Sequence, residues 1–84
     1  TGVCLKSNSI TETFSVKSTI HFAPISSEEI NYYVDTYQPL DKAGAYGIQE
    51  WIGMIGVKKI IGSYYNVVGL PTHEIYQKIM EKFI

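Results

Sequence analysis

With 84 residues, the chain is long enough for one small domain, and a domain of that size leaves much of its surface in water. Hydrophobic residues make up 45% of the chain and charged residues 18%, with a formal net charge of −1, a balance that excludes a disordered tail. The seven residues counted as lysine or arginine are all lysines, so the chain has no arginine. The composition therefore gives no support for binding to nucleic acid or to a membrane surface.

The single cysteine, Cys4, excludes an internal disulfide and a cysteine-based zinc site, and we expect a cytoplasmic protein. No apolar run reaches the roughly 18 residues that a membrane helix needs, and the start of the chain lacks the pattern of a signal peptide. The chain begins TGVCL, without Met and directly in an apolar run. We expect this start to lie in the middle of a longer protein.

The first predicted elements are two strands. Residues 1–6 place Val3 and Leu5 on one side, and the polar residues 7–9 that follow are typical of a turn. Over residues 11–22, hydrophobic and polar side chains alternate with the period of a half-buried strand. We expect the two strands to pair as an antiparallel hairpin.

A helix start follows at the sequence ISSEEI. Ser26 as N-cap and Glu29 three residues later form a capping box, and the flanking Ile25 and Ile30 have the spacing of a hydrophobic staple. Apolar residues then recur at helical spacing. They predict one buried helix face, made of Ile30, Tyr33, Val34 and Tyr37. Pro39 ends the helix.

The next part of the chain predicts a loop over residues 38–47 and an ambiguous segment over residues 48–61. The start of this segment fits helical spacing, but Gly53 and Gly56 weaken a helix. Its later residues are β-branched, so we expect a strand there.

At the C-terminal end, Ser63 is the predicted cap of a short helical turn, and an amphipathic helix opens at Pro71. The predicted order is strand, strand, helix, loop, strand, helix, without repeats or linkers. This order indicates a mixed α/β (α+β) fold, and fits part of a layered sheet better than a complete domain.

Two histidines and the cysteine are weak candidates for chemistry. His21 is expected on the polar face of a strand and His73 in the first turn of a helix, and neither has a further ligand or nucleophile at a recognisable spacing. Cys4 alternates with apolar neighbours, so we expect it to pack within a sheet. We interpret the two histidines as surface residues.

The stretch DKAGAYGIQ is the strongest candidate for a binding loop. Gly44 and Gly47 allow a ligand to approach the backbone closely, and Lys42 can neutralise phosphate oxygens. The amide of Gln49 offers one acceptor and two donors, which match the edge of a nucleobase or any other amide. The alternative is a tight glycine turn, with Asp41 and Lys42 in solvent and Gln49 capping the backbone. The residues leave both interpretations open.

The motifs DKAGAYGIQ at 41–49 and GSYYNVVGLP at 62–71 resemble the C-terminal half of the Maf family of nucleoside triphosphate pyrophosphatases. The opening TGV and the helix start SSEEINYYV match in order and spacing, so the resemblance covers essentially all 84 residues. It implies the C-terminal lobe of a mixed α/β, Maf/ITPase-like fold with a cleft between two lobes. It also implies a cytoplasmic, metal-dependent hydrolase that cleaves a nucleoside triphosphate to the monophosphate and pyrophosphate.

The resemblance further implies roles for single residues. Gln49 matches the residue that marks the branch preferring dTTP and UTP, and would read the pyrimidine edge through paired hydrogen bonds. Asp41 and Lys42 match the adjoining polar pair, with Lys42 contacting phosphate or bracing the loop, and Gly44 and Gly47 complete the substrate-binding set. A divalent ion, Mg²⁺ or Mn²⁺, is the implied cofactor of the parent enzyme.

The family's Ser-Pro-Arg-Arg-like phosphate-binding motif and its general-base Asp are not among these residues. We therefore expect residues 1–84 to be a single C-terminal lobe that is inactive alone, part of an active parent enzyme, and we assign no catalytic or metal-ligating residue in it. Strands that pair with the rest of the parent enzyme would lack their partners here. We therefore expect exposed apolar faces, and a homodimer that covers them. The alternative is a non-catalytic nucleotide-binding or oligomerisation module.

Overall fold

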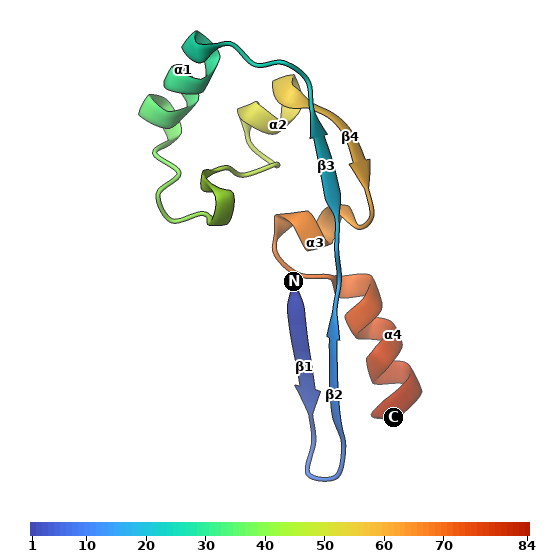
Figure 1. The fold of residues 1–84 in the computed structure, drawn as a ribbon. Coiled ribbons are helices and arrows are strands. Elements are labelled where there is room, and N and C mark those ends of the chain that lie inside the picture. Colours follow the sequence, from blue (N-terminus) through green and yellow to red (C-terminus); the bar gives the residue numbers. More distant parts are fainter. The chain divides into compact units, whose positions relative to one another are not determined.

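The computed structural model describes residues 1–84 (Figure 1). The chain divides into two units: residues 1–18 with 62–84 form the first unit, and residues 19–61 form the second. The mixed α/β class is confirmed, because four α-helices accompany two antiparallel, two-stranded sheets. None of the helices has the length and apolar character needed to cross a membrane.

The first unit begins with the predicted β-hairpin. Strands β1 (Gly2–Lys6) and β2 (Thr11–Ser15) pair antiparallel, and half-buried side chains alternate with exposed ones along both. In the turn, the Ser7 hydroxyl accepts a hydrogen bond from the Ile10 amide (3.1 Å). A serine hydroxyl that bonds nearby backbone in this way stabilises a turn.

Two helices complete the first unit. Helix α3 (Tyr64–Val68) is capped as predicted by Ser63, whose hydroxyl accepts a hydrogen bond from the Asn66 amide (3.1 Å). Helix α4 (Thr72–Lys82) follows Pro71, at the predicted position. Both starts are encoded locally, by a side-chain cap in one case and by the fixed φ of proline in the other.

The prediction of one strand over residues 11–22 is wrong. The structure has two strands there, β2 and β3 (Thr19–Phe22), in different sheets. Between them, the Val16 carbonyl and the Ser18 hydroxyl accept hydrogen bonds from the side-chain amide of the buried Asn66, at 3.1 and 3.0 Å. Side-chain burial still alternates across this break, so a period-two pattern could not reveal that the bonding partner changes.

The second unit is bounded by a strand pair. Strand β3 pairs antiparallel with β4 (Val57–Ile61), and Thr19 lies opposite Ile61. Between the two strands the chain forms, in order, α1 (Ser27–Tyr37), a 3-10 turn (Ala43–Ala45) and α2 (Trp51–Gly56). Figure 1 shows the loop between α1 and α2, in green and yellow, as the longest irregular segment of this unit.

Helix α1 begins at the predicted capping box. The Ser26 hydroxyl accepts a hydrogen bond from the Glu29 amide (3.1 Å), and the Glu29 carboxylate accepts one from the Ser26 amide (3.0 Å). Bonding to Ser26, its backbone amide above all, stabilises the ionised carboxylate and lowers the pKa of Glu29. The helix ends at Gln38, which adopts the left-handed conformation (φ 44°) before the buried Pro39.

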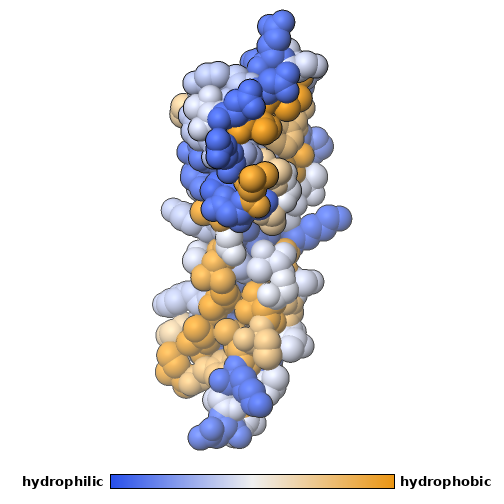
Figure 2. All heavy atoms as spheres, turned by 90° about the vertical axis from the view of Figure 1, so that its left-hand side faces the viewer, coloured by the Kyte–Doolittle hydropathy of each residue, from blue (hydrophilic) through white to orange (hydrophobic).

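Only one residue of the predicted buried face of α1 is buried. Tyr33 is 3% exposed, whereas Ile30 is 47% and Val34 44% exposed. The core of the second unit is small and contains Tyr33, Ile48 and Ile52. Figure 2 shows hydrophobic side chains, in orange, on the surface of both units. The expected exposed apolar faces are therefore present, and helical spacing alone did not tell which residues would be covered.

The ambiguous segment over residues 48–61 contains a helix followed by a strand, as its two patterns indicated. The helix is the short α2, and the strand β4 occupies the β-branched part. Gly56 is buried where the two meet, and a Cβ there would lie 2.7 Å from Cδ1 of Ile25. The glycine that weakened the helix prediction thus permits close packing.

Candidate functional site

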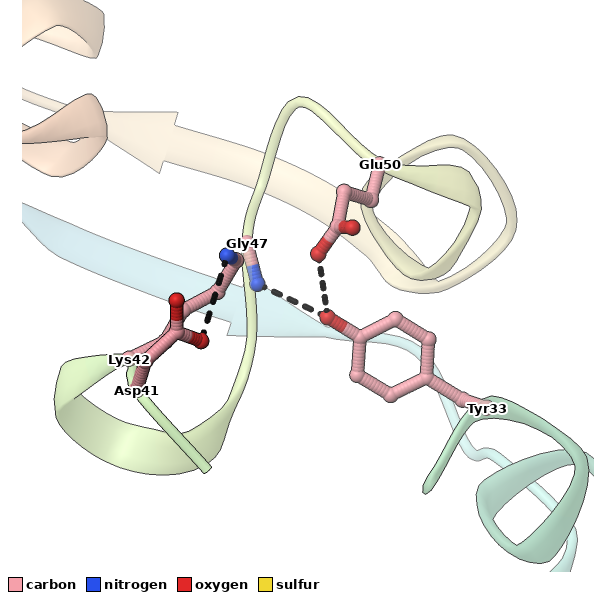
Figure 3. A network of polar contacts seen from close by, with 5 residues as sticks. All are labelled: Tyr33, Asp41, Lys42, Gly47 and Glu50. Atoms are coloured by element: carbon pink, nitrogen blue, oxygen red, sulfur yellow. Dashed lines mark hydrogen bonds and ion pairs between the residues drawn. The ribbon is translucent and has the colours of Figure 1, made fainter. Parts of the chain in front are cut away.

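The candidate loop, residues 39–51, is tied to α1 by one tyrosine. Figure 3 shows Tyr33 reaching from α1 to the loop. Its hydroxyl donates a hydrogen bond to Oε1 of Glu50 (2.7 Å) and accepts one from the amide of Gly47 (2.9 Å). Helix α1 and two positions of the loop, Gly47 and Glu50, are therefore held together at a single oxygen atom.

Tyr33 is buried, so its hydroxyl needs both of these partners. Burial, and after it the hydrogen bond to Glu50, raise the pKa of the Tyr33 phenol above its ordinary value. The phenol therefore stays neutral at physiological pH and keeps its proton as the donor to Glu50.

Aromatic packing holds the two sides of the loop. The Tyr46 ring meets Phe22 of β3 edge to face, with ring centroids 5.3 Å apart. Trp51, at the start of α2, meets Tyr32 of α1 in the same way at 4.9 Å. Edge-to-face pairs at these separations are favourable. Residues 47–50 therefore lie between two aromatic side chains, Tyr46 and Trp51, each of which packs against another element.

Gly44 lies in the turn at residues 43–45, where its φ is 72°. This left-handed conformation favours glycine, because a side chain would strain the backbone. A Cβ at Gly44 would have only the Tyr46 ring nearby, at 3.9 Å. The role of Gly44 within the chain is therefore to shape the turn.

Gly47 is the point at which the polar side chains of the loop converge. A Cβ at Gly47 would lie 2.7 Å from Oε1 of Glu50, 3.0 Å from Cε of Lys42 and 3.2 Å from Nε2 of Gln49. An acid, a base and an amide therefore surround a backbone position at which a methyl group would require these side chains to move.

Lys42 and Asp41 form an ion pair with Nζ 3.6 Å from Oδ1 (Figure 3). The side chains are 31% and 83% exposed, and an exposed pair of this kind contributes at most about 1 kcal/mol to stability. The ammonium group of Lys42 can therefore exchange this partner for another anion at little cost.

Gln49 is exposed, and its side chain makes no hydrogen bond within the chain. This arrangement departs from the alternative interpretation, in which Gln49 caps a neighbouring backbone group. The amide nitrogen lies over Gly47, and its donors and acceptor are available to a ligand.

The structure brings four of the five candidate residues together: Asp41, Lys42, Gly47 and Gln49. Gly44 lies apart, in the turn. Sequence reasoning missed Tyr33 and Glu50 as members of the site. One signal was available, because a tyrosine on a predicted buried face needs a hydrogen-bond partner for its hydroxyl.

The remaining candidates do not gather into a site. His21, His73 and Cys4 are all exposed, so the prediction that Cys4 packs within its sheet is wrong. Cys4 points away from the half-buried side of β1, where Val3 and Leu5 lie. No group of three or more His, Cys, Asp or Glu side chains could hold a metal ion. The residues of this chain therefore do not fit a divalent-metal site of their own.

Two surface depressions of the second unit lie at the two ends of the candidate loop. One, of about 310 Å³, is lined by Glu28, Glu29, Tyr32 and Trp51. The other, of about 260 Å³, is lined by Val34, Asp35, Gln38 and Leu40. Neither is lined by the polar groups that converge on Gly47.

Comparison with known proteins gives one family. The family model described as Maf-like protein matches residues 1–82. A protein named dTTP/UTP pyrophosphatase from Bacteroides thetaiotaomicron is 56% identical over 79 residues, which are 94% of this chain and 41% of the relative. Its namesakes from Parabacteroides distasonis and Christiangramia forsetii are 57% and 51% identical, over 94% and 96% of this chain. The chain spans about 41% of the length of these curated relatives.

Proposed function

Since this chain belongs to the Maf-like protein family, we propose that it forms the base-recognition part of a nucleoside triphosphate pyrophosphatase. The whole protein would hydrolyse dTTP or UTP to the monophosphate and pyrophosphate. Relatives that carry the name dTTP/UTP pyrophosphatase support this proposal. The observation that carries it is the convergence of Lys42, Gln49 and Glu50 over Gly47.

In this proposal, Gln49 reads the base. Uracil and thymine present the N3–H donor beside a carbonyl acceptor, and an amide offers the complementary acceptor and donor. The side chain of Gln49 is exposed and has no partner within the chain, so binding a base breaks no existing hydrogen bond. A site of this kind rejects bases with the wrong pattern because its polar groups would be left without partners.

Lys42 would bind phosphate in the same proposal. Phosphoryl transfer depends on positioning and on neutralising the charge of the phosphate oxygens. The ammonium group of Lys42 can leave the exposed Asp41 for a phosphate oxygen, and its stem already packs against Gly47. Asp41 would hold the lysine over the loop until the nucleotide arrives, and Gly44 would give the loop its turn.

We further propose that Mg²⁺ or Mn²⁺ is the cofactor of the whole protein, and that its ligands lie outside these 84 residues, since no cluster here fits it. Such an ion would neutralise phosphate charge.

A cytoplasmic location and a homodimer belong to the same proposal. The exposed apolar side chains of both units support the dimer, and a monomer by light scattering at micromolar concentration would count against it.

Pyrophosphate release from dTTP and UTP with Mg²⁺ or Mn²⁺ tests the proposal. We expect release by the full-length protein that contains this chain, and none by the 84 residues alone, because Lys42 as the one cation of the loop cannot neutralise a triphosphate. If the full-length protein releases no pyrophosphate from any nucleotide, the proposed pyrophosphatase activity is refuted. If it instead binds dTTP without turnover, the chain belongs to a non-catalytic nucleotide-binding module.

A further inference from the structure

We propose that Tyr33 and Glu50 set the direction of the Gln49 amide, and that this direction makes the loop select uracil or thymine over cytosine. The inference rests on the proposed function and assigns two positioning residues to it. Neither residue has to touch the nucleotide, because both act through Gln49.

The first step is that the Glu50 carboxylate is held in place. Its Oε1 atom accepts a hydrogen bond from the Tyr33 hydroxyl at 2.7 Å. The same hydroxyl accepts a hydrogen bond from the Gly47 amide at 2.9 Å, so it acts as a donor and as an acceptor at once. Because the Tyr33 ring is 3% exposed, packing fixes the phenol oxygen, and the phenol oxygen in turn fixes the carboxylate.

The second step concerns the Gln49 amide, which lies near the same glycine as this carboxylate. Oε1 of Glu50 and Nε2 of Gln49 lie 2.7 and 3.2 Å from one point, the position of a Cβ on Gly47. A carboxylate only accepts hydrogen bonds, so it attracts the NH₂ end of an amide and repels the oxygen end. Glu50 thereby favours one of the two orientations of the Gln49 amide and leaves its oxygen on the side away from the carboxylate.

The third step links this orientation to the base. Along the N3–C4 edge, uracil and thymine present a donor and then an acceptor, whereas cytosine presents an acceptor and then a donor. An amide that can turn over pairs with either edge, but an amide held in one orientation pairs with only one. Holding the Gln49 amide therefore converts an unselective hydrogen-bonding group into one that discriminates against cytosine.

The experiment compares variants of the full-length protein that contains this chain. Tyr33→Phe removes the hydroxyl that holds Glu50. Glu50→Gln keeps an acceptor for Tyr33 but adds a donor beside Gln49. Tyr37→Phe is the matched control, since Tyr37 stacks on Tyr33 with ring centroids 5.0 Å apart and its hydroxyl makes no hydrogen bond within the chain. Pyrophosphate release from dTTP and dCTP gives kcat/KM for each nucleotide.

We expect Tyr33→Phe and Glu50→Gln to lower the preference for dTTP over dCTP roughly tenfold, the scale of one misplaced hydrogen bond, while Tyr37→Phe keeps it. If the two residues had a purely structural role, the variants would lower kcat/KM for dTTP and for dCTP by the same factor, and the ratio of the two values would not change. Should Tyr33→Phe fail to fold, Glu50→Gln decides the question, because it keeps an acceptor for Tyr33. Unchanged preference in a folded Glu50→Gln protein would overturn the inference and leave the proposed function standing. If the parent protein releases no pyrophosphate from dTTP or UTP, the proposed function fails and the inference fails with it.

Discussion

The backbone of Gly53 lies so close to Ile48 that a Cβ on Gly53 would overlap the Ile48 carbonyl group. At the same place, the Gly53 amide donates a hydrogen bond to the Glu50 carbonyl (3.0 Å). The contact closes the first turn of α2 onto the end of the candidate loop. Gly53, which weakens a helix by propensity, is therefore the residue that lets this helix start where it does.

Gly53→Ala should lower the free energy of unfolding by about 1–3 kcal/mol, because the new methyl group has to displace backbone rather than a flexible side chain. Thermal unfolding of the protein measures the change. Gly2→Ala is the matched control, since a Cβ at Gly2 meets nothing within 4 Å. Equal melting temperatures for the two variants would contradict the packing argument.

Gly47→Ala should raise the KM for dTTP in the full-length protein roughly tenfold, which corresponds to about 1.4 kcal/mol. The methyl group would lie 2.7 Å from Oε1 of Glu50 and 3.2 Å from Nε2 of Gln49. Glu50 cannot move away without stretching its bond to Tyr33. Steady-state kinetics with dTTP give the answer, and a KM equal to that of Gly2→Ala would show that the loop absorbs the methyl group.

Under the proposed function, Gln49→Glu in the full-length protein should reduce the discrimination in favour of uracil or thymine by about 1–3 kcal/mol, the cost of one mismatched hydrogen-bonding group. The carboxylate accepts from N3–H but cannot donate to a base carbonyl. The ratio of kcat/KM for dTTP and dCTP measures the loss. The exposed Gln77 on α4 gives the control Gln77→Glu, with the same change of charge. An unchanged ratio would remove Gln49 from base recognition.

The capping box makes the start of α1 sensitive to acid. The pKa of Glu29 is lowered in the folded chain, so its stabilising effect is complete above the ordinary glutamate pKa of about 4.3 and is lost as the pH falls through the lowered value. Helix content by circular dichroism should fall on acidification and depend less on pH in Glu29→Gln. Glu28→Gln, in the same first turn, is the control. The same pH profile in both variants would contradict the role of the box.

Tyr33 should ionise only above the ordinary pKa of tyrosine, since burial and the hydrogen bond to Glu50 raise its pKa. The folded state holds this proton more tightly than the unfolded chain. The contribution to stability is therefore complete below the ordinary tyrosine pKa of about 10 and is lost as the pH rises through the higher value. The absorbance of tyrosinate during alkaline titration should include a component above the ordinary tyrosine pKa, and Tyr33→Phe should lose it. If Tyr37→Phe removes that component instead, the assignment to Tyr33 is wrong.

Features that depend on neighbouring residues were predictable from the sequence. The capping box at Ser26 and the cap at Ser63 both form as expected, with bonds that join residues three apart. The hairpin and the strand in the later part of residues 48–61 also follow from local patterns. These signals are reliable because donor, acceptor and turn belong to one short segment.

Features that depend on distant residues were not predictable. The break after β2 involves Asn66, which lies 50 residues from Val16 in sequence. The link from Tyr33 to Glu50 joins residues 17 apart, and nothing in either local pattern pairs them. The candidate loop could be found from its residue types, but the convergence of its side chains on Gly47 required the fold.

The pairing of Thr19 with Ile61 places both ends of the second unit at a single rung of the β3–β4 ladder. The two ends of residues 19–61 therefore lie next to each other. The segment between them contains the whole candidate loop and the two aromatic pairs that pack it, Tyr46 with Phe22 and Trp51 with Tyr32. A segment with adjacent ends can be transplanted without stretching its host. The candidate loop can therefore be exchanged between members of this family as one contiguous stretch of gene.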